Sequence, residues 1–150
     1  MITESKSGLL SSRARLRFTG RDNVPRDGAA VIVANHVSFI DWFFITAASR
    51  RPVRFVMDHR MFGNPLLGWA FRLSKAIPIA PAKEDAALKE KAFAEISKAL
   101  RNGDLVCIFP EGMITHDGRL NPFKPGVERI LAMDPVPVIP MALDGLWGSF

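Results

Sequence analysis

Hydrophobic residues occur in short blocks along this chain, and their spacing changes from block to block. Short continuous or alternating apolar runs are typical of strands that are buried in a sheet. The predicted strands cover residues 29–34, 53–57, 76–80, 104–109 and 136–143. Between them, apolar residues recur at helical spacing over 66–73, 85–101 and 126–133. A short helix over 39–49 is also predicted, and consecutive apolar residues make it apolar on more than one face.

The order of these elements indicates the fold class. Strands alternate with helices, which is the arrangement that builds parallel sheets. The run at 104–109 is apolar after Asp104, which favours a central strand. We therefore expect an α/β domain with a mostly parallel, twisted sheet and helices on both faces. It is expected to cover residues 18–150, after an N-terminal tail over 1–17. With no closing helix after the last strand, either a C-terminally truncated domain or a short one fits.

One corner of the predicted sheet carries candidate chemistry. His36 follows the strand at 29–34, and Asp41 lies near the start of the next helix. Functional groups collect at such strand ends in parallel α/β folds. If the turn brings Asp41 back to His36, its carboxylate fixes the imidazole tautomer and leaves the other ring nitrogen free as a base. On spacing alone, a loop histidine beside a helix cap fits equally well.

Composition limits the possible partners. With 150 residues, 48% of them hydrophobic, the chain is long and apolar enough for one folded core. Its net charge of +5 favours anionic partners: nucleic acid, an acidic membrane surface or phosphate-bearing substrates. The basic residues are mostly scattered and tyrosine is absent, which disfavours a nucleic-acid-binding domain.

The sequence also bears on the compartment. No uninterrupted apolar stretch reaches the length of a membrane-spanning helix, and residues 1–16 do not resemble a signal peptide. The single cysteine, Cys107, lies within the apolar run at 104–109, so we expect a buried structural thiol. One cysteine excludes an internal disulfide, which agrees with a cytoplasmic setting.

Three short motifs occur in a fixed order. An N-H-x-x-x-x-D pattern is formed by Asn35, His36 and Asp41, F-P-E-G stands at 109–112, and V-P-V-I-P stands at 136–140. Together they resemble the blocks of the glycerolipid acyltransferases, which include 1-acylglycerol-3-phosphate acyltransferases and related lysophospholipid acyltransferases.

This resemblance implies a lysophospholipid O-acyltransferase. Such an enzyme moves a fatty acyl group from an acyl thioester, acyl-coenzyme A or acyl-carrier protein, to a glycerol hydroxyl. His36 would be the general base, and Asp41 would orient it and stabilise the imidazolium. A backbone amide near Glu111 and Gly112, or one near Asn35, would stabilise the oxyanion. The resemblance implies no cofactor and no metal. It does imply peripheral contact with the cytoplasmic face of the cell inner membrane.

An anionic lipid substrate also needs cationic contacts. Lys124 precedes a predicted helix start, which suits a phosphate, although a surface lysine fits as well. The residues predicted to bind substrate are Asn35, Lys75, Lys83, Glu111, Gly112 and Lys124.

The chain departs from the family pattern at two arginine positions. Met113 and Ile114 follow F-P-E-G, and Pro81 stands where the second block of the family has arginine. Lys75 or Lys83 offers a point charge there rather than a bidentate fork. The pattern is similar to the acyltransferase domain of bacterial 2-acylglycerophosphoethanolamine acyltransferase/acyl-carrier-protein synthetases. A phosphodiester head group of that kind requires fewer cations.

One other interpretation is open at this point. A catalytically weak lipid- or acyl-carrier-binding module has the same fold, although the joint presence of His36, Asp41 and Glu111 favours an enzyme. No paired spacing of metal ligands appears around the histidines. A group of apolar side chains fits either an approach for an acyl chain or core packing. Its members are Trp42, Phe43, Phe62, Leu66, Leu67, Trp69 and Phe71.

Overall fold

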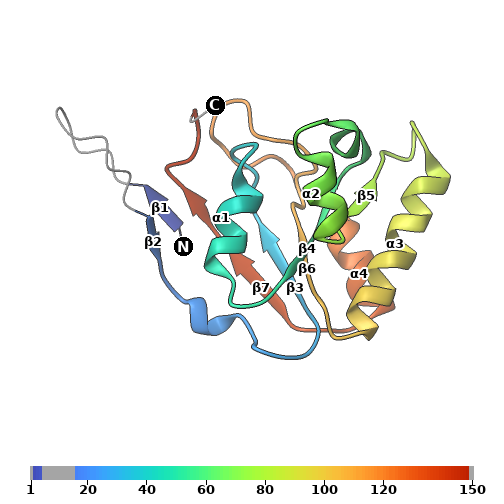
Figure 1. Ribbon diagram of the computed structural model, residues 1–150, viewed down its shortest axis with the longest axis horizontal. Coiled ribbons are helices and arrows are strands. Elements are labelled where there is room, and N and C mark those ends of the chain that lie inside the picture. Colours follow the sequence, from blue (N-terminus) through green and yellow to red (C-terminus); the bar gives the residue numbers. More distant parts are fainter. Residues whose placement is uncertain (1, 5–15, 149–150) are drawn as a thin grey trace.

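The computed structural model describes residues 2–4 and 16–148. At its centre lies a five-stranded sheet in the order β5-β4-β6-β3-β7, in which every neighbouring pair is parallel (Figure 1). The strands are β3 (Ala30–Ala34), β4 (Val53–Asp58), β5 (Ile77–Ile79), β6 (Leu105–Ile108) and β7 (Val138–Met141). The predicted parallel α/β fold is confirmed.

Helices cover both faces of the sheet, as the alternation within β3 requires. Ile32 points into a core that includes Ile45 of α1, whereas Val31 points into a second core with Ile96 of α3. In Figure 1, α1 and α2 lie in front of the sheet, and α3 and α4 lie at its right, where they pack on the second core. The helices are α1 (Asp41–Ala48), α2 (Gly68–Leu73), α3 (Ala86–Arg101) and α4 (Gly126–Met133), and two short 3-10 turns are η1 (Arg21–Asn23) and η2 (His59–Gly63).

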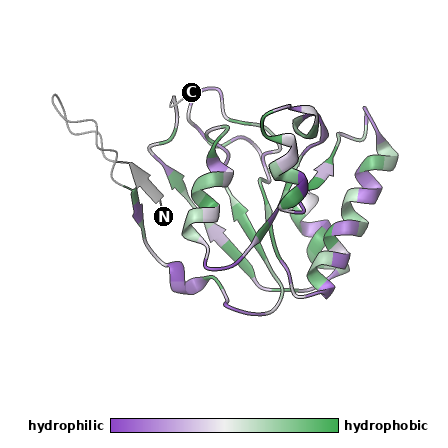
Figure 2. Cartoon of the chain, in the orientation of Figure 1, coloured by the Kyte–Doolittle hydropathy of each residue, from purple (hydrophilic) through white to green (hydrophobic). Residues whose placement is uncertain are grey.

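The long helix α3 shows how the sequence pattern becomes packing. Asp85 caps its start by accepting a hydrogen bond from the backbone N–H of Leu88 at 2.8 Å. Phe93, Ile96 and Leu100 are buried against the sheet. Figure 2 shows the alternation of hydrophilic and hydrophobic colour along α3 and the hydrophobic strands of the sheet beneath it.

The register of β3 and β6 brings two loops together. Val33 lies opposite Ile108 in this parallel pair, so both strands end at the same edge of the sheet. His36 follows β3 and Glu111 follows β6 within three residues of these positions. The carboxyl edge, where the sequence predicts the site, therefore collects both motifs.

Outside the main sheet, β1 (Ile2–Glu4), β2 (Leu16–Phe18) and β8 (Leu143–Asp144) form a three-stranded sheet in the order β2-β1-β8. The predicted tail over 1–17 therefore includes one strand and the start of another. The strand β1 pairs with β8, which lies near the other end of the sequence. Residues 5–15 of that tail lie outside the described residues. The predicted strand at 136–143 is divided between β7 and β8.

None of the helices in the described ranges is long and apolar enough to cross a bilayer.

Candidate active site

The imidazole of His36 contacts the carboxylate of Asp41 at the carboxyl edge of β3. Nδ1 of His36 lies 2.9 Å from Oδ2 of Asp41. The Asp41 side chain is fully buried, whereas 21% of the His36 side chain is exposed. In the tautomer that carries its proton on Nδ1, His36 donates to the carboxylate and Nε2 keeps a free lone pair. The pair thus has the arrangement of a base and the group that orients it.

The same carboxylate shapes the turn between β3 and α1. Oδ2 of Asp41 also accepts hydrogen bonds from the backbone N–H groups of Val37 at 2.7 Å and Ser38 at 3.0 Å. These donors, and the N-terminus of α1 where Asp41 stands, stabilise a negative charge on Asp41. They also explain why the helix begins at Asp41 rather than at the predicted residue 39: residues 37–38 are held in the turn.

The F-P-E-G segment covers one face of the His36 ring. The rings of His36 and Phe109 stack with centroids 4.1 Å apart and planes 16° apart. The carbonyl oxygen of His36 accepts a hydrogen bond from the backbone N–H of Thr115 at 2.9 Å. The loop after β6 therefore holds both the ring and the backbone of His36.

Glu111 joins the two loops through its buried carboxylate. Only 2% of Glu111 is exposed. Its Oε1 accepts from the backbone N–H of His36 at 2.8 Å, and its Oε2 accepts from that of Asn121 at 2.7 Å. Each carboxylate oxygen thus accepts a hydrogen bond from a backbone amide. The sequence predicted Glu111 as a substrate contact and did not reveal these two bonds. The available signal was an acidic residue directly after an entirely apolar strand.

Asn35 forms a similar clamp on the other side. Its Nδ2 donates to the carbonyl oxygen of Leu143 at 2.9 Å, and its Oδ1 accepts from the backbone N–H of Leu143 at 2.7 Å. The amide therefore ties the end of β3 to β8. Like Glu111, Asn35 was predicted to bind substrate, and the structure shows it engaged with protein backbone.

Gly112 and Lys124 lie against each other next to Glu111. A Cβ atom on Gly112 would stand 2.5 Å from Nζ of Lys124, and Gly112 has a φ of +66°. The backbone N–H of Lys124 donates to the carbonyl oxygen of Pro110 at 2.9 Å. Lys124 is exposed, and its ammonium forms no ion pair with any residue that the structure describes. The structure thus places one predicted cation beside the F-P-E-G loop.

Comparison with known proteins agrees with this geometry. Residues 15–144 match the profile of the family described as Acyltransferase. The chain belongs to the acyltransferase family. The family suggested by the three sequence motifs is therefore confirmed.

Named relatives share most of the acyltransferase domain. The chloroplastic 1-acyl-sn-glycerol-3-phosphate acyltransferase BAT2 of Brassica napus is 32% identical over 127 residues, which is 84% of this chain and 36% of that protein. The 1-acyl-sn-glycerol-3-phosphate acyltransferase of Pseudomonas aeruginosa is 30% identical over 128 residues, 85% of this chain and 49% of that protein. The chain thus spans between about a third and a half of these curated relatives.

A solved structure is similar as well. The crystal structure of the 1-acyl-sn-glycerophosphate (LPA) acyltransferase PlsC from Thermotoga maritima superimposes with a TM-score of 0.67 at 26% sequence identity. The match covers 82% of this chain and 47% of the PlsC chain.

Two of the predicted lysines lie away from His36 in the acyltransferase domain. Lys75 precedes β5, so it stands at the amino edge of the sheet, opposite the site. Lys83 follows β5 at the correct edge, but β4 and β6 separate that strand from β3 by roughly 14 Å at the usual strand spacing. We therefore do not retain Lys75 as a substrate contact, because strand direction places it at the wrong end.

The histidines do not gather into a metal site. His59 lies in η2, and His116 lies on the exposed loop after Glu111. Within residues 2–4 and 16–148, no group of three or more His, Cys, Asp and Glu side chains is arranged to hold an ion.

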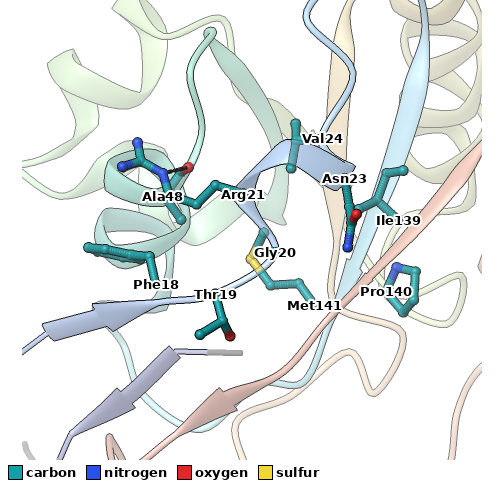
Figure 3. Close-up of a pocket in the computed structure, with 10 residues that line it drawn as sticks. All are labelled: Phe18, Thr19, Gly20, Arg21, Asn23, Val24, Ala48, Ile139, Pro140 and Met141. Atoms are coloured by element: carbon teal, nitrogen blue, oxygen red, sulfur yellow. Dashed lines mark hydrogen bonds between the residues drawn. The ribbon is translucent and has the colours of Figure 1, made fainter.

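A small pocket lies between the segment before β3, the end of α1 and β7. It measures about 70 Å³ and is lined by Phe18, Thr19, Gly20, Arg21, Asn23, Val24, Ala48, Ile139, Pro140 and Met141 (Figure 3). Nε of Arg21 donates to the carbonyl oxygen of Ala48 at 2.9 Å beside it. Two of its lining residues, Pro140 and Met141, pair with Val33 and Ala34 of β3, so the pocket reaches the strand end that His36 follows, although neither His36 nor Asp41 lines it.

Proposed function

We propose that this domain transfers a fatty acyl group from an acyl thioester to a glycerol hydroxyl of a lysophospholipid. The contact between His36 and Asp41, within a chain of the acyltransferase family, carries this proposal. The similar proteins are named for 1-acyl-sn-glycerol-3-phosphate, so lysophosphatidate is the first acceptor to test. Acyl-coenzyme A and acyl-carrier protein are the donors we propose.

The proposed step starts at Nε2 of His36. A neutral hydroxyl is a weak nucleophile, so Nε2 removes its proton as the oxygen attacks the thioester carbonyl. The buried charge of Asp41 stabilises the imidazolium that forms. The tetrahedral intermediate then collapses, the carbon–sulfur bond breaks, and the leaving thiolate takes the proton from His36. An ester and a free thiol result, with no covalent enzyme intermediate.

The hydrogen bonds of the site narrow the choice of oxyanion donor. The N–H of His36 is bonded to Glu111, and that of Gly112 is bonded to the carbonyl oxygen of Phe109 at 3.0 Å. The N–H groups of Val37 and Ser38 are bonded to Asp41. These four amides are therefore occupied in the structure, and the developing charge requires another donor or a movement of the loop.

Lys124 is the cation that we propose for the head group. Its Nζ lies against Gly112, directly beside the loop that holds His36. Met113 and Ile114 stand where the family pattern has an arginine. Two cations, Arg119 and Lys124, follow the motif before α4, and Lys124 is the one whose ammonium lies against Gly112. A lysine is a point charge that suits one phosphate oxygen at a time. Lysophosphatidate and a phosphodiester lysophospholipid are therefore both included in the test.

The acceptor is a lipid, so we propose peripheral binding at a membrane surface, on the cytoplasmic face of the inner membrane. The net charge of +5 supports contact with acidic lipid.

The deciding experiment measures acyl transfer by the 150-residue chain. Labelled acyl-coenzyme A or acyl-carrier protein is incubated with lysophosphatidate, lysophosphatidylglycerol or lysophosphatidylethanolamine, and the product is quantified. His36→Ala is expected to lower turnover by about 10²–10⁴-fold, the contribution of a general base. His116→Ala is the control, since it removes an exposed histidine that has no contact with the pair.

Two results contradict the proposal. Equal turnover by wild type and His36→Ala removes His36 as the base. No turnover with any acceptor, under conditions where the protein is folded and binds lipid, favours the lipid- or acyl-carrier-binding module.

A further inference from the structure

The outer side of α2 carries large apolar residues that point into solvent. Leu66, just before the helix, is 78% exposed, and Trp69 and Leu73 on the helix are 61% and 76% exposed. Their spacing of three and four positions places them on one side of the helix. Gly68 and Phe71 of the same helix are buried. The helix α2 is therefore apolar on both its inner and its outer side.

The neighbouring helix α1 also carries exposed apolar residues. The rings of Trp42 in α1 and Phe71 in α2 are in edge-to-face contact with centroids 5.5 Å apart, so the helices are neighbours on one face of the sheet (Figure 1). On α1, Phe43 is 53% exposed, and Phe39 in the turn before it is also exposed. We call Phe39, Phe43, Leu66, Trp69 and Leu73 the apolar face.

Two members of the apolar face are close in sequence to the candidate active site. Phe39 and Phe43 stand two positions before and after Asp41, the partner of His36, and both are exposed whereas Asp41 is buried. The turn and helix that hold Asp41 therefore also carry part of the apolar face.

Two cations lie next to the exposed apolar residues of α2. Elsewhere between residues 42 and 83, Arg50, Arg54 and Arg60 form ion pairs with acidic residues. Arg72 and Lys75, beside the exposed stripe of α2, are themselves exposed. The guanidinium of Arg72 donates from Nη1 to the carbonyl oxygen of Phe62 at 2.9 Å, a bond that leaves its charge without a carboxylate partner among the described residues.

Exposed aromatic and aliphatic side chains flanked by cations match the interface of an acidic bilayer. Apolar side chains enter the boundary between head groups and acyl chains, while Lys and Arg contact lipid phosphates. Tryptophan favours this depth because its ring is apolar and its N–H is polar. A binding surface for a soluble protein does not require both exposed apolar side chains and unpaired cations beside them.

We propose that the apolar face docks on an anionic phospholipid membrane and presents the His36 site to lipid at that surface. The inference rests on the proposed function in one respect: the acceptor is a membrane lipid. It adds the surface of the chain that meets the membrane.

Co-sedimentation with sucrose-loaded vesicles tests this assignment without any turnover. The vesicles contain equimolar phosphatidylethanolamine and phosphatidylglycerol, or phosphatidylcholine alone, and hold no lysophospholipid or acyl donor. The triple variant Leu66→Ser/Trp69→Ser/Leu73→Ser is expected to bind the anionic vesicles at least tenfold more weakly than wild type. The control Met133→Ser/Val138→Ser removes exposed apolar side chains on α4 and β7, outside the apolar face, and is expected to bind as wild type does.

The cations have their own variant. Arg72→Gln/Lys75→Gln is expected to weaken binding to the anionic vesicles, by about fivefold for each charge near the surface, and to leave the weak binding to phosphatidylcholine unchanged. A readout on unmodified protein removes any dependence on folding of the variants: brominated acyl chains in the anionic vesicles are expected to quench tryptophan emission.

Several outcomes overturn the inference. They are unchanged binding by the triple variant, absence of quenching, and a wild-type dimer in gel filtration that the triple variant converts to monomer, which assigns the face to a second copy. His36→Ala is expected to bind vesicles like wild type. Lack of acyl transfer with intact vesicle binding therefore contradicts only the proposed function, and transfer with unaltered binding by the triple variant contradicts only the docking surface.

Discussion

The buried carboxylate of Glu111 holds the backbone N–H of His36 at 2.8 Å, across 75 positions of sequence. Its second oxygen holds Asn121. The loop after β3 and the loop after β6 are therefore joined through Glu111. This residue of the F-P-E-G motif positions His36 through its backbone, and neither of its hydrogen bonds is to the imidazole ring.

Glu111→Gln separates a positioning role from a substrate contact. A carboxamide has a single acceptor oxygen, so one of the two backbone amides loses its partner inside the protein, at a cost of about 1–3 kcal/mol. We expect a lower free energy of unfolding and a lower kcat for acyl transfer, with the KM for the acceptor unchanged. Glu128→Gln in the first turn of α4 is the matched control, because that side chain is exposed. A raised acceptor KM with normal kcat would show that Glu111 binds substrate directly.

Asp41→Asn tests the orienting contact. An asparagine oxygen still accepts hydrogen bonds from Val37 and Ser38, so the turn is expected to persist. An amide cannot stabilise the imidazolium of His36, and kcat is therefore expected to fall by about 10²–10⁴-fold. The proposed mechanism makes the two residues one unit, so His36→Ala/Asp41→Asn should be no slower than His36→Ala alone. A fully additive loss in steady-state assays would exclude the pair as a unit.

Gly112→Ala tests whether the position of Lys124 matters. The new Cβ would stand 2.5 Å from Nζ of Lys124, so the ammonium must move. Gly28→Ala is a matched control, because Gly28 has a φ of +79° and no atom within 4 Å of the added Cβ. Each variant is expected to lose about 1–2 kcal/mol of stability from its left-handed backbone. Only Gly112→Ala is expected to raise the KM for the acceptor. An equal KM in both variants would argue against a phosphate contact by Lys124.

Cys107 is expected to be unreactive in the native protein. Burial, and next the negative charge of Asp41, raise the pKa of its thiol, so the neutral form persists at neutral pH. Alkylation at pH 8 should be complete in denaturant and negligible without it. Acyl transfer should survive treatment of the folded protein with iodoacetamide. Rapid labelling of the native thiol would show that β6 opens or that the central strand is misplaced.

Much of the fold follows from local pattern. The predicted helix at 126–133 coincides with α4, and β6 is buried along its whole length at the centre of the sheet, as its apolar run predicts. The proximity of His36 and Asp41 also followed from the corner between strand and helix. In these cases the determining residues lie close together in sequence.

Other features depend on partners that carry no sequence signature. Glu111 and Asn35 bind backbone groups of distant residues, and any residue type supplies such a group. Lys75 was assigned by a short motif, but the direction of β5 decides which edge it occupies. The outer side of α2 was open to interpretation as core, because periodicity identifies an apolar side chain without showing whether another layer covers it.

The clamp between Asn35 and Leu143 spans 108 positions of the chain. During synthesis, β3 leaves the ribosome long before β7 and β8, which supply its outer neighbour and the partner of Asn35. The corner that holds His36 is thus completed only after residues 138–144 have been translated. Contacts of such wide separation make folding slow, so the nascent chain is expected to lack a complete candidate site until these residues have emerged and paired.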